Sequence, residues 1–346
     1  MKRQFGRTLD DEILRFRIEK LRLISGTSGS ENIAIFCIRF SPNYRFILAT
    51  SQSGHVTYYD PKDGTVIDRI TAHSDAANSI TFLNENQFFT DSDDKSIKLW
   101  DVRNQEKWVL CLRDQHTDWV KNVNVIDDKT IVSGGFDGKI ISWDLSRPTE
   151  DKSVESKVLF TGCNSTDLQD DAPVRNFLLR TAYSPLSKTL FMSFLLPECM
   201  LAYNNFDVDS FDETFLHDAL QSFESHGLEN YPYRSLYKDD LSNQSVSLLH
   251  NWQSLYREEK PIIQSIEPHK NSPCMLIRST HGPADDYKEF TSVVDTSIET
   301  HNWSEETDFV KVAKRALPFT KEEPISRDDI IRECNFSDCG RFIGQF

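Results

Sequence analysis

The chain has 346 residues, a formal net charge of −15 at pH 7 and a hydrophobic share of 38%. A negative charge of this size argues against general binding to nucleic acid or to anionic membranes, whose phosphates repel acidic surfaces. The seven cysteines include no Cys-x-x-Cys pair and their number is odd, so neither a zinc site nor a secreted disulfide framework is indicated.

Residues 1–31 are predicted to form an N-terminal helix and a Gly/Ser linker. Leu9–Ile24 contains apolar residues, among them Ile13 and Phe16, with acidic residues at its start and basic residues later, the order that the helix dipole favours. Such a helix either packs on its own domain or docks on a partner, and the sequence leaves both open. The charged N-terminus and the lack of a long apolar stretch predict an intracellular protein, in the nucleus, the cytoplasm or both.

Residues 32–206 are predicted to fold as short strands in four successive groups. In the first group, the turn signals Ser41-Pro42-Asn43 and Ser53-Gly54 separate three apolar runs, and the last run ends in Tyr59-Asp60. No aspartate stands six residues before Tyr59, a difference from the two groups that follow.

The second and third groups are two copies of one pattern. The first copy contains His73, Thr90, Asp94 and Trp100, and the second contains His116, Ser133, Asp137 and Trp143. The gaps are 17, 4 and 6 residues in both copies, and an aspartate follows each tryptophan. A period of about 40–45 residues ending in Trp-Asp is typical of one four-stranded blade of a WD-repeat β-propeller. We therefore predict that each set of four forms a buried hydrogen-bond chain, Trp–Ser/Thr–His–Asp, that closes its blade.

Chemical alternatives for this stretch are weaker. A Ser-His-Asp set resembles a hydrolase triad, but its repetition at blade spacing favours a structural role. Asp91, Asp93 and Asp94 lack the glycine and the distal glutamate of a calcium loop. The glycines of 134–139 have the wrong spacing for a phosphate loop, and Ile140 replaces the required Ser or Thr. An enzyme in the central channel would need titratable groups converging from several strands, and the sequence contains no such set. No enzyme, metal or cofactor is predicted.

The second half of the chain fits the pattern less well. Residues 151–172 are polar and are expected to form a loop, and 174–206 a fourth blade without Trp-Asp. Residues 207–260 are acidic and rich in Ser and Asn, which predicts a mostly disordered insertion. Over 261–346 we expect a fifth blade and part of a sixth. Because a propeller open there leaves unpaired edges, we expect a full-length relative to continue for about one and a half blades. The fold class is thus an all-β propeller of five to six recognisable blades with an N-terminal helix.

The sequence Trp100-Asp101-Val102-Arg103 gives the clearest indication of function. Asp101 and Arg103 follow the third strand of the blade and are predicted on its rim, where a guanidinium is able to make paired hydrogen bonds to a partner. Residues 88–103 resemble the box by which WD-repeat substrate receptors dock on damage-specific DNA-binding protein 1 (DDB1), the adaptor of cullin-4 ubiquitin ligases. Asp91 departs from the small residue of that box, and the second copy has Ser146 in place of the arginine. Residues 116–122, 133–144, 147–151 and 331–341 are also similar to the cullin-4-associated factors.

This resemblance implies a substrate-recognition subunit of a cullin-4 RING E3 ubiquitin ligase, which promotes ubiquitination without catalysing it. Asp101 and Arg103 would bind the DDB1 adaptor, and the helix around Ile13 and Phe16 would add to that contact. The implied partners are DDB1, the cullin-4 ligase and an unknown protein substrate. The alternative is a WD-repeat scaffold in an unrelated multiprotein complex, which gives Arg103 no special role.

Overall fold

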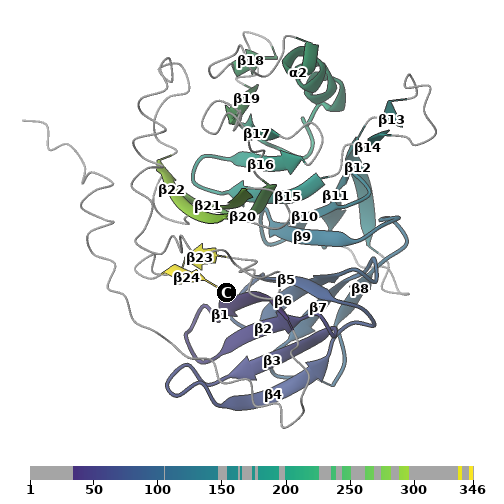
Figure 1. The fold of residues 1–346 in the computed structure, drawn as a ribbon. Helices are drawn as coiled ribbons and strands as arrows, with labels where there is room; N and C mark the ends of the chain where they lie inside the picture. Colours follow the sequence, from purple (N-terminus) through teal and green to yellow (C-terminus); the bar gives the residue numbers. More distant parts are fainter. Residues whose placement is uncertain are drawn as a thin grey trace, which may run out of the picture.

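The computed structural model describes residues 34–104, 106–146, 154–162, 164–165, 174–175, 178–194, 199–225, 235–238, 244–250, 262–268, 274–281, 288–295, 334–336 and 343–345. These residues form small antiparallel sheets that follow one another along the chain, with one helix at one end of the molecule (Figure 1). None of the described helical residues belongs to a segment with the length and apolar character that a bilayer crossing requires. The predicted helix Leu9–Ile24, with Ile13 and Phe16, lies outside the described residues.

The first three sheets each have four strands in chain order, the arrangement of a propeller blade. The first sheet contains β1 (Ile35–Phe40), β2 (Ile47–Ser51), β3 (His55–Tyr59) and β4 (Val66–Thr71). The second contains β5 (Ala77–Phe82), β6 (Gln87–Ser92), β7 (Ile97–Asp101) and β8 (Leu110–Leu112). The third contains β9 (Val120–Val125), β10 (Thr130–Gly135), β11 (Lys139–Asp144) and β12 (Glu155–Thr161).

The turn between the second and third strands has the same conformation in all three sheets. Gly54, Lys95 and Gly138 occupy its left-handed position, with φ of 75°, 68° and 77°. Glycine suits this position because it has no Cβ to clash with the backbone. At Gly54 a Cβ would also collide with backbone atoms of His73 and Asp75, so the turn of the first sheet sits directly against the chain that enters the second.

Apolar side chains fill the space between neighbouring sheets. Phe88 packs with Tyr58 and other residues of the first sheet, whereas the adjacent Phe89 packs with residues of the third sheet, among them Ile131. Strand β6 is therefore buried on both faces, which explains why its sequence lacks a clear alternation of apolar and polar residues. A further cluster joins the third sheet to the fourth through residues such as Phe160 and Leu190.

Side-chain amides and hydroxyls join the innermost strands of successive sheets. Asn78 Nδ2 donates to the carbonyl of Val120 over 2.7 Å, and Thr81 Oγ1 donates to that of Val123 over 2.7 Å. In the same way Asn122 Oδ1 accepts from the backbone N–H of Thr181 over 3.0 Å. These bonds fix the stagger of one sheet against the next, because each uses a buried or partly buried polar group that needs a partner.

The fourth sheet corrects the expectation of a mostly disordered insertion over 207–260. Its strands β15 (Leu178–Ser184), β16 (Thr189–Phe194) and β17 (Cys199–Asn204) continue, after helix α2 (Glu213–Ser225), with β19 (Ser245–His250) and β18 (Ser235–Tyr237). The side chains of Leu216, Ala219 and Leu220 on α2 are buried in the same core cluster as the sheet. The helical spacing of these apolar residues is masked by the acidic and polar residues around them. Residues 226–234, 239–243 and 251–260 of this stretch lie outside the described residues.

The expected loop over 151–172 also differs from the structure, because β12 lies within it. Only Leu159 and Phe160 of this strand are buried, and the rest of the strand faces solvent wholly or in part. Strand β4 is similarly exposed except at Ile70. An outermost strand covers little core, so its composition resembles that of a loop.

The remaining described strands are shorter assemblies. Strands β13 (Asn164–Ser165) and β14 (Val174–Arg175) pair with each other, as do β23 (Cys334–Phe336) and β24 (Ile343–Gln345). Strands β20 (Ile262–Pro268), β21 (Cys274–His281) and β22 (Lys288–Asp295) form a sheet of three. An ion pair of 3.2 Å joins Arg39 of β1 to Glu267 of β20, and β20 also packs beside β15. Strand β20 thus contacts both β1 of the first sheet and β15 of the fourth.

Candidate functional site

The four predicted residues of the second sheet form one continuous chain of hydrogen bonds. Trp100 Nε1 donates to Thr90 Oγ1 over 2.9 Å, Thr90 Oγ1 lies 2.8 Å from His73 Nε2, and His73 Nδ1 lies 2.9 Å from Asp94 Oδ2. The bonds are all satisfied when Asp94 is ionised, His73 is neutral with its proton on Nδ1, and Thr90 donates to Nε2. The set therefore joins the outer connection, the second strand and the third strand of the blade.

The third sheet repeats this geometry. Trp143 Nε1 donates to Ser133 Oγ over 2.9 Å, and Ser133 Oγ lies 2.8 Å from His116 Nε2. His116 Nδ1 is 3.1 Å from Asp137 Oδ1. The Ser133 side chain is fully buried, so its hydroxyl serves the indole and the imidazole and not an incoming substrate. A Cβ on Gly135 would lie 2.5 Å from His116 Nδ1, which explains the glycine at that place.

Burial and charge act on the ionisable members of these chains. Burial lowers the pKa of His73 below its usual value, and its effect outweighs the opposite pull of Asp94. Burial alone would raise the pKa of Asp94, but hydrogen bonds from His73 and Ser96 outweigh it, so that pKa lies below its usual value. The pKa of Asp137 is lowered in the same way, burial opposing and the bonds from His116 and Thr117 prevailing.

The acidic cluster at 91–94 is divided among separate protein partners. Asp93 accepts from Asn78 over 2.7 Å and pairs with Lys121 over 2.9 Å. Asp91 accepts a hydrogen bond from Ser79, and Asp94 belongs to the chain described above. The three carboxylates therefore hold parts of neighbouring strands together.

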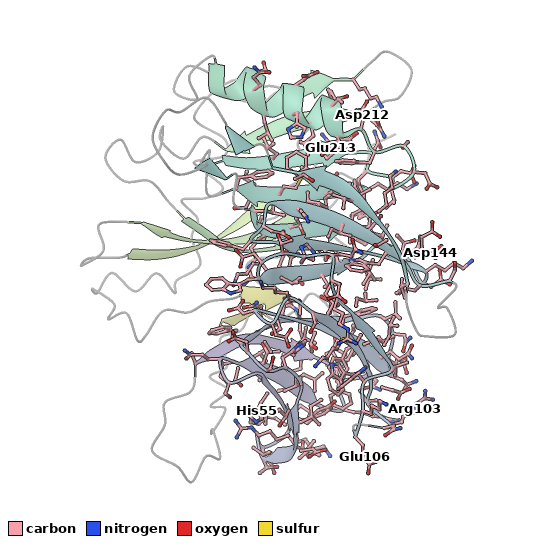
Figure 2. All side chains as sticks on the ribbon, turned by 90° about the vertical axis from the view of Figure 1, so that its right-hand side faces the viewer. His55, Arg103, Glu106, Asp144, Asp212 and Glu213 are labelled. Carbon is pink, nitrogen blue, oxygen red and sulfur yellow. The ribbon has the colours of Figure 1, made fainter. Side chains whose placement is uncertain are left out.

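Asp101, the last residue of β7, forms a two-point ion pair with Arg103. Arg103 Nε donates to Asp101 Oδ1 over 2.9 Å, and Arg103 Nη2 donates to Asp101 Oδ2 over 2.6 Å. The Arg103 side chain is 68% exposed, whereas that of Asp101 is 14% exposed. Figure 2 shows Arg103 and Asp144 on the same side of the molecule, with His55 away from them. The guanidinium is thus on the surface, and a carboxylate fixes its orientation.

An aspartate at or directly after the end of the third strand has the same local role in each of the first three sheets. Asp60, Asp101 and Asp144 each accept a hydrogen bond from the backbone N–H two residues later, over 2.8, 2.9 and 2.8 Å. This is the Asx-turn geometry that short acidic side chains favour. The residue at the donor position differs: it is Lys62, Arg103 or Ser146. The fork contact to the aspartate is therefore a property of Arg103 and not of the turn.

The hydrogen bonds from Arg103 dominate the electrostatics of this pair. They lower the pKa of Asp101 to about 2, and the carboxylate in turn raises the pKa of Arg103. Both groups are charged throughout the neutral range. Because the pair lies at the surface, its contribution to stability is screened by solvent and is small. The pair therefore serves better as a recognition feature than as a stabilising one.

Comparisons with known proteins find similarity to a WD40 domain and to DDB1- and CUL4-associated factors. A family model described as the anaphase-promoting complex subunit 4 WD40 domain matches residues 7–85. The DDB1- and CUL4-associated factor 10 of Xenopus tropicalis is 36% identical over 130 residues, covering 37% of this chain and 28% of that protein. The Homo sapiens protein of the same name is 36% identical over 130 residues, covering 37% of this chain and 23% of that protein. The matched part thus spans about a quarter of the length of these relatives.

Among solved structures, the β-propeller domain of Cps50 (Swd1) from Myceliophteria thermophila has a TM-score of 0.49 and 12% identity, and the match covers 77% of this chain and 69% of that one. The family match and the four-stranded antiparallel sheets confirm the predicted WD-repeat β-propeller fold. The expectation that the chain is not an enzyme agrees with these names, which describe repeats and associations and no reaction.

Proposed function

We propose that the chain is a substrate-recognition subunit of a cullin-4 RING E3 ubiquitin ligase and that it docks on DDB1 through Asp101 and Arg103. The names of the relatives support the choice of ligase, since two proteins that are 36% identical to this chain over 130 residues are DDB1- and CUL4-associated factors. The observation that carries the docking site is the exposed guanidinium of Arg103, held by Asp101 at the end of β7. An intracellular location, in the nucleus, the cytoplasm or both, is part of the same proposal.

The geometry of the pair suits docking because it leaves donors for a partner. A guanidinium has five N–H groups, and the contact with Asp101 uses two of them. The remaining three project from a side chain that is mostly exposed. A planar fork held in one orientation loses little entropy when it meets a carboxylate or carbonyl group of another protein.

In this role the chain supplies proximity and not chemistry. One surface binds the adaptor and another binds a protein substrate, so the substrate is held near the ligase that transfers ubiquitin. The predicted helix around Ile13 and Phe16 would add a second contact to the adaptor, and two weak contacts on one chain bind more tightly than either alone.

The test is co-purification of DDB1 with the full chain and with two alanine variants. Arg103→Ala is expected to reduce the recovered DDB1 at least tenfold, because it removes the guanidinium group that is proposed to bind DDB1. Lys62→Ala is the matched control, since Lys62 is exposed and occupies the equivalent turn position of the first sheet. We expect it to leave recovery unchanged, and both variants to keep the wild-type circular dichroism spectrum.

Two outcomes would contradict the proposal. If wild-type chain recovers no DDB1 but co-purifies with a different stable complex, the alternative of a WD-repeat scaffold in an unrelated assembly is correct. If DDB1 is recovered equally with Arg103→Ala and with residues 1–31 deleted, the docking site lies elsewhere on the chain.

A further inference from the structure

Trp108 is a large apolar side chain held on the surface close to the proposed docking site. It lies in the connection between β7 and β8, five residues after Arg103, and it is 39% exposed. The next residue, Val109, is 40% exposed. Exposed apolar groups that adjoin one another on a loop are more informative than single ones, because they mark surfaces that a partner covers.

The indole of Trp108 is fixed by two contacts. It meets the ring of Trp100 edge-on, with centroids 6.4 Å apart and an interplanar angle of 82°. Lys98 Nζ lies 4.6 Å from the centroid of the Trp108 ring and also donates to the carbonyl of Ala72 over 2.6 Å. The lysine is therefore anchored to the connection between the first and second sheets, and it restrains the indole from one side. A side chain restrained in this way is prepared for binding, because little rotamer freedom remains to be lost.

The same stretch of backbone positions Trp108 and Arg103. Trp100, on which the indole rests, directly precedes Asp101, which holds the guanidinium. Val109 is tied to the end of the same strand by a hydrogen bond of 2.7 Å from its N–H to the carbonyl of Leu99. An apolar group and a forked cation are thus carried on one short, braced connection.

Tryptophan and arginine are the residues that most often dominate the energy of protein interfaces, usually with apolar neighbours that exclude water. We infer that Trp108 and Val109 form the apolar part of the surface whose charged part is the Asp101–Arg103 pair, and that DDB1 receives the indole in an apolar pocket beside a carboxylate or carbonyl group. This inference rests on the proposed function. It adds a determinant that the Trp-Asp-x-Arg sequence does not contain.

The chain offers a close control in Trp119. This tryptophan is 43% exposed and also has a lysine over its ring, with Lys121 Nζ 4.4 Å from the centroid. It lies in the connection between β8 and β9, which is at the opposite end of β8 from Trp108. A general loss of exposed aromatic surface would affect the two positions alike, whereas a docking role affects Trp108 alone.

The experiment is isothermal titration calorimetry of the full chain with purified DDB1. Trp108→Ala is expected to raise the dissociation constant at least tenfold, and Trp119→Ala to change it less than twofold. Because Trp108→Ala also removes a contact to Trp100, Val109→Asp is measured as well. It places a charge in the apolar surface without touching the indole contacts, and it is expected to weaken binding at least fivefold with an unchanged thermal midpoint.

The results separate the two proposals. If Arg103→Ala weakens binding while Trp108→Ala and Val109→Asp do not, the inference about Trp108 is wrong and the proposed function stands. If Trp119→Ala weakens binding as much as Trp108→Ala, the apolar surface is not specific to this connection and the inference is likewise wrong. If the wild-type chain gives no heat of binding with DDB1, the proposed function fails and the inference fails with it.

Discussion

Arg103 and Asp101 are joined at two points, so the guanidinium meets any partner with its orientation already set. An unpaired arginine on a loop would sample many rotamers and would lose that freedom on binding. The carboxylate also offsets the positive charge, so long-range attraction to an acidic partner is weak. Recognition by this pair therefore depends on shape and on short hydrogen bonds more than on net charge.

Asp101→Asn is predicted to weaken DDB1 binding by about threefold to tenfold, less than Arg103→Ala does. An asparagine keeps one oxygen for the backbone N–H of Arg103, so the turn is preserved, but the two-point contact with the fork is lost. The dissociation constant from calorimetry measures the effect. Asp60→Asn, at the equivalent turn of the first sheet, is the control and is expected to bind as the wild type does. Equal or tighter binding by Asp101→Asn would mean that DDB1 separates the pair.

Thr90→Val is predicted to lower the free energy of unfolding by about 2–4 kcal/mol. The substitution keeps the shape but leaves the buried Trp100 indole N–H without its acceptor and His73 Nε2 without its donor. Thr90→Ser keeps the hydroxyl and reproduces the residue of the third sheet, Ser133, so it should cost only about 1 kcal/mol for the lost methyl group. Urea unfolding of the two variants beside the wild type measures both values. Equal losses in the two variants would show that packing, and not the hydrogen-bond chain, is what Thr90 contributes.

His73 is predicted to stay neutral to a lower pH than a free histidine. Burial lowers its pKa in the folded chain, so the unfolded chain takes up the proton first as the pH falls below the ordinary value of 6.5. The contribution of His73 to stability is therefore complete above that value and is lost below it. Asp94, whose pKa is also lowered, adds a further loss at more acidic pH. A titration of the His73 ring followed by NMR should give a midpoint below 6.5, and a midpoint above 6.5 would contradict the neutral form in the hydrogen-bond chain.

The spacing of repeated residues predicted much of the site because a hydrogen-bond chain fixes its members at set distances along the strands. His116, Ser133, Asp137 and Trp143 were identifiable for this reason, whereas the turn beside Gly54 was identifiable from its Ser-Gly sequence. The pairing of Arg103 with Asp101 was not predictable, since it depends on a side-chain rotamer. Trp108 carries no periodic signal and was recognisable only once its exposure was known. Strand β12 was missed because outer strands bury little, and α2 because polar residues hide its apolar face.

Leu216→Ala is predicted to destabilise the chain by about 2–5 kcal/mol, which tests whether α2 belongs to the folded body. Leu216 is fully buried in the cluster that joins the third and fourth sheets, and the helix is started by Asp212, whose Oδ1 accepts from the N–H groups of Thr214 and Phe215 over 3.0 and 3.2 Å. Asp218→Ala, on the exposed side of the same helix, should change stability by less than about 0.5 kcal/mol. Urea unfolding measures both. If Leu216→Ala were as stable as Asp218→Ala, the helix would contribute no core to the blade, and residues 207–225 would behave in solution as the disordered insertion that their composition predicts.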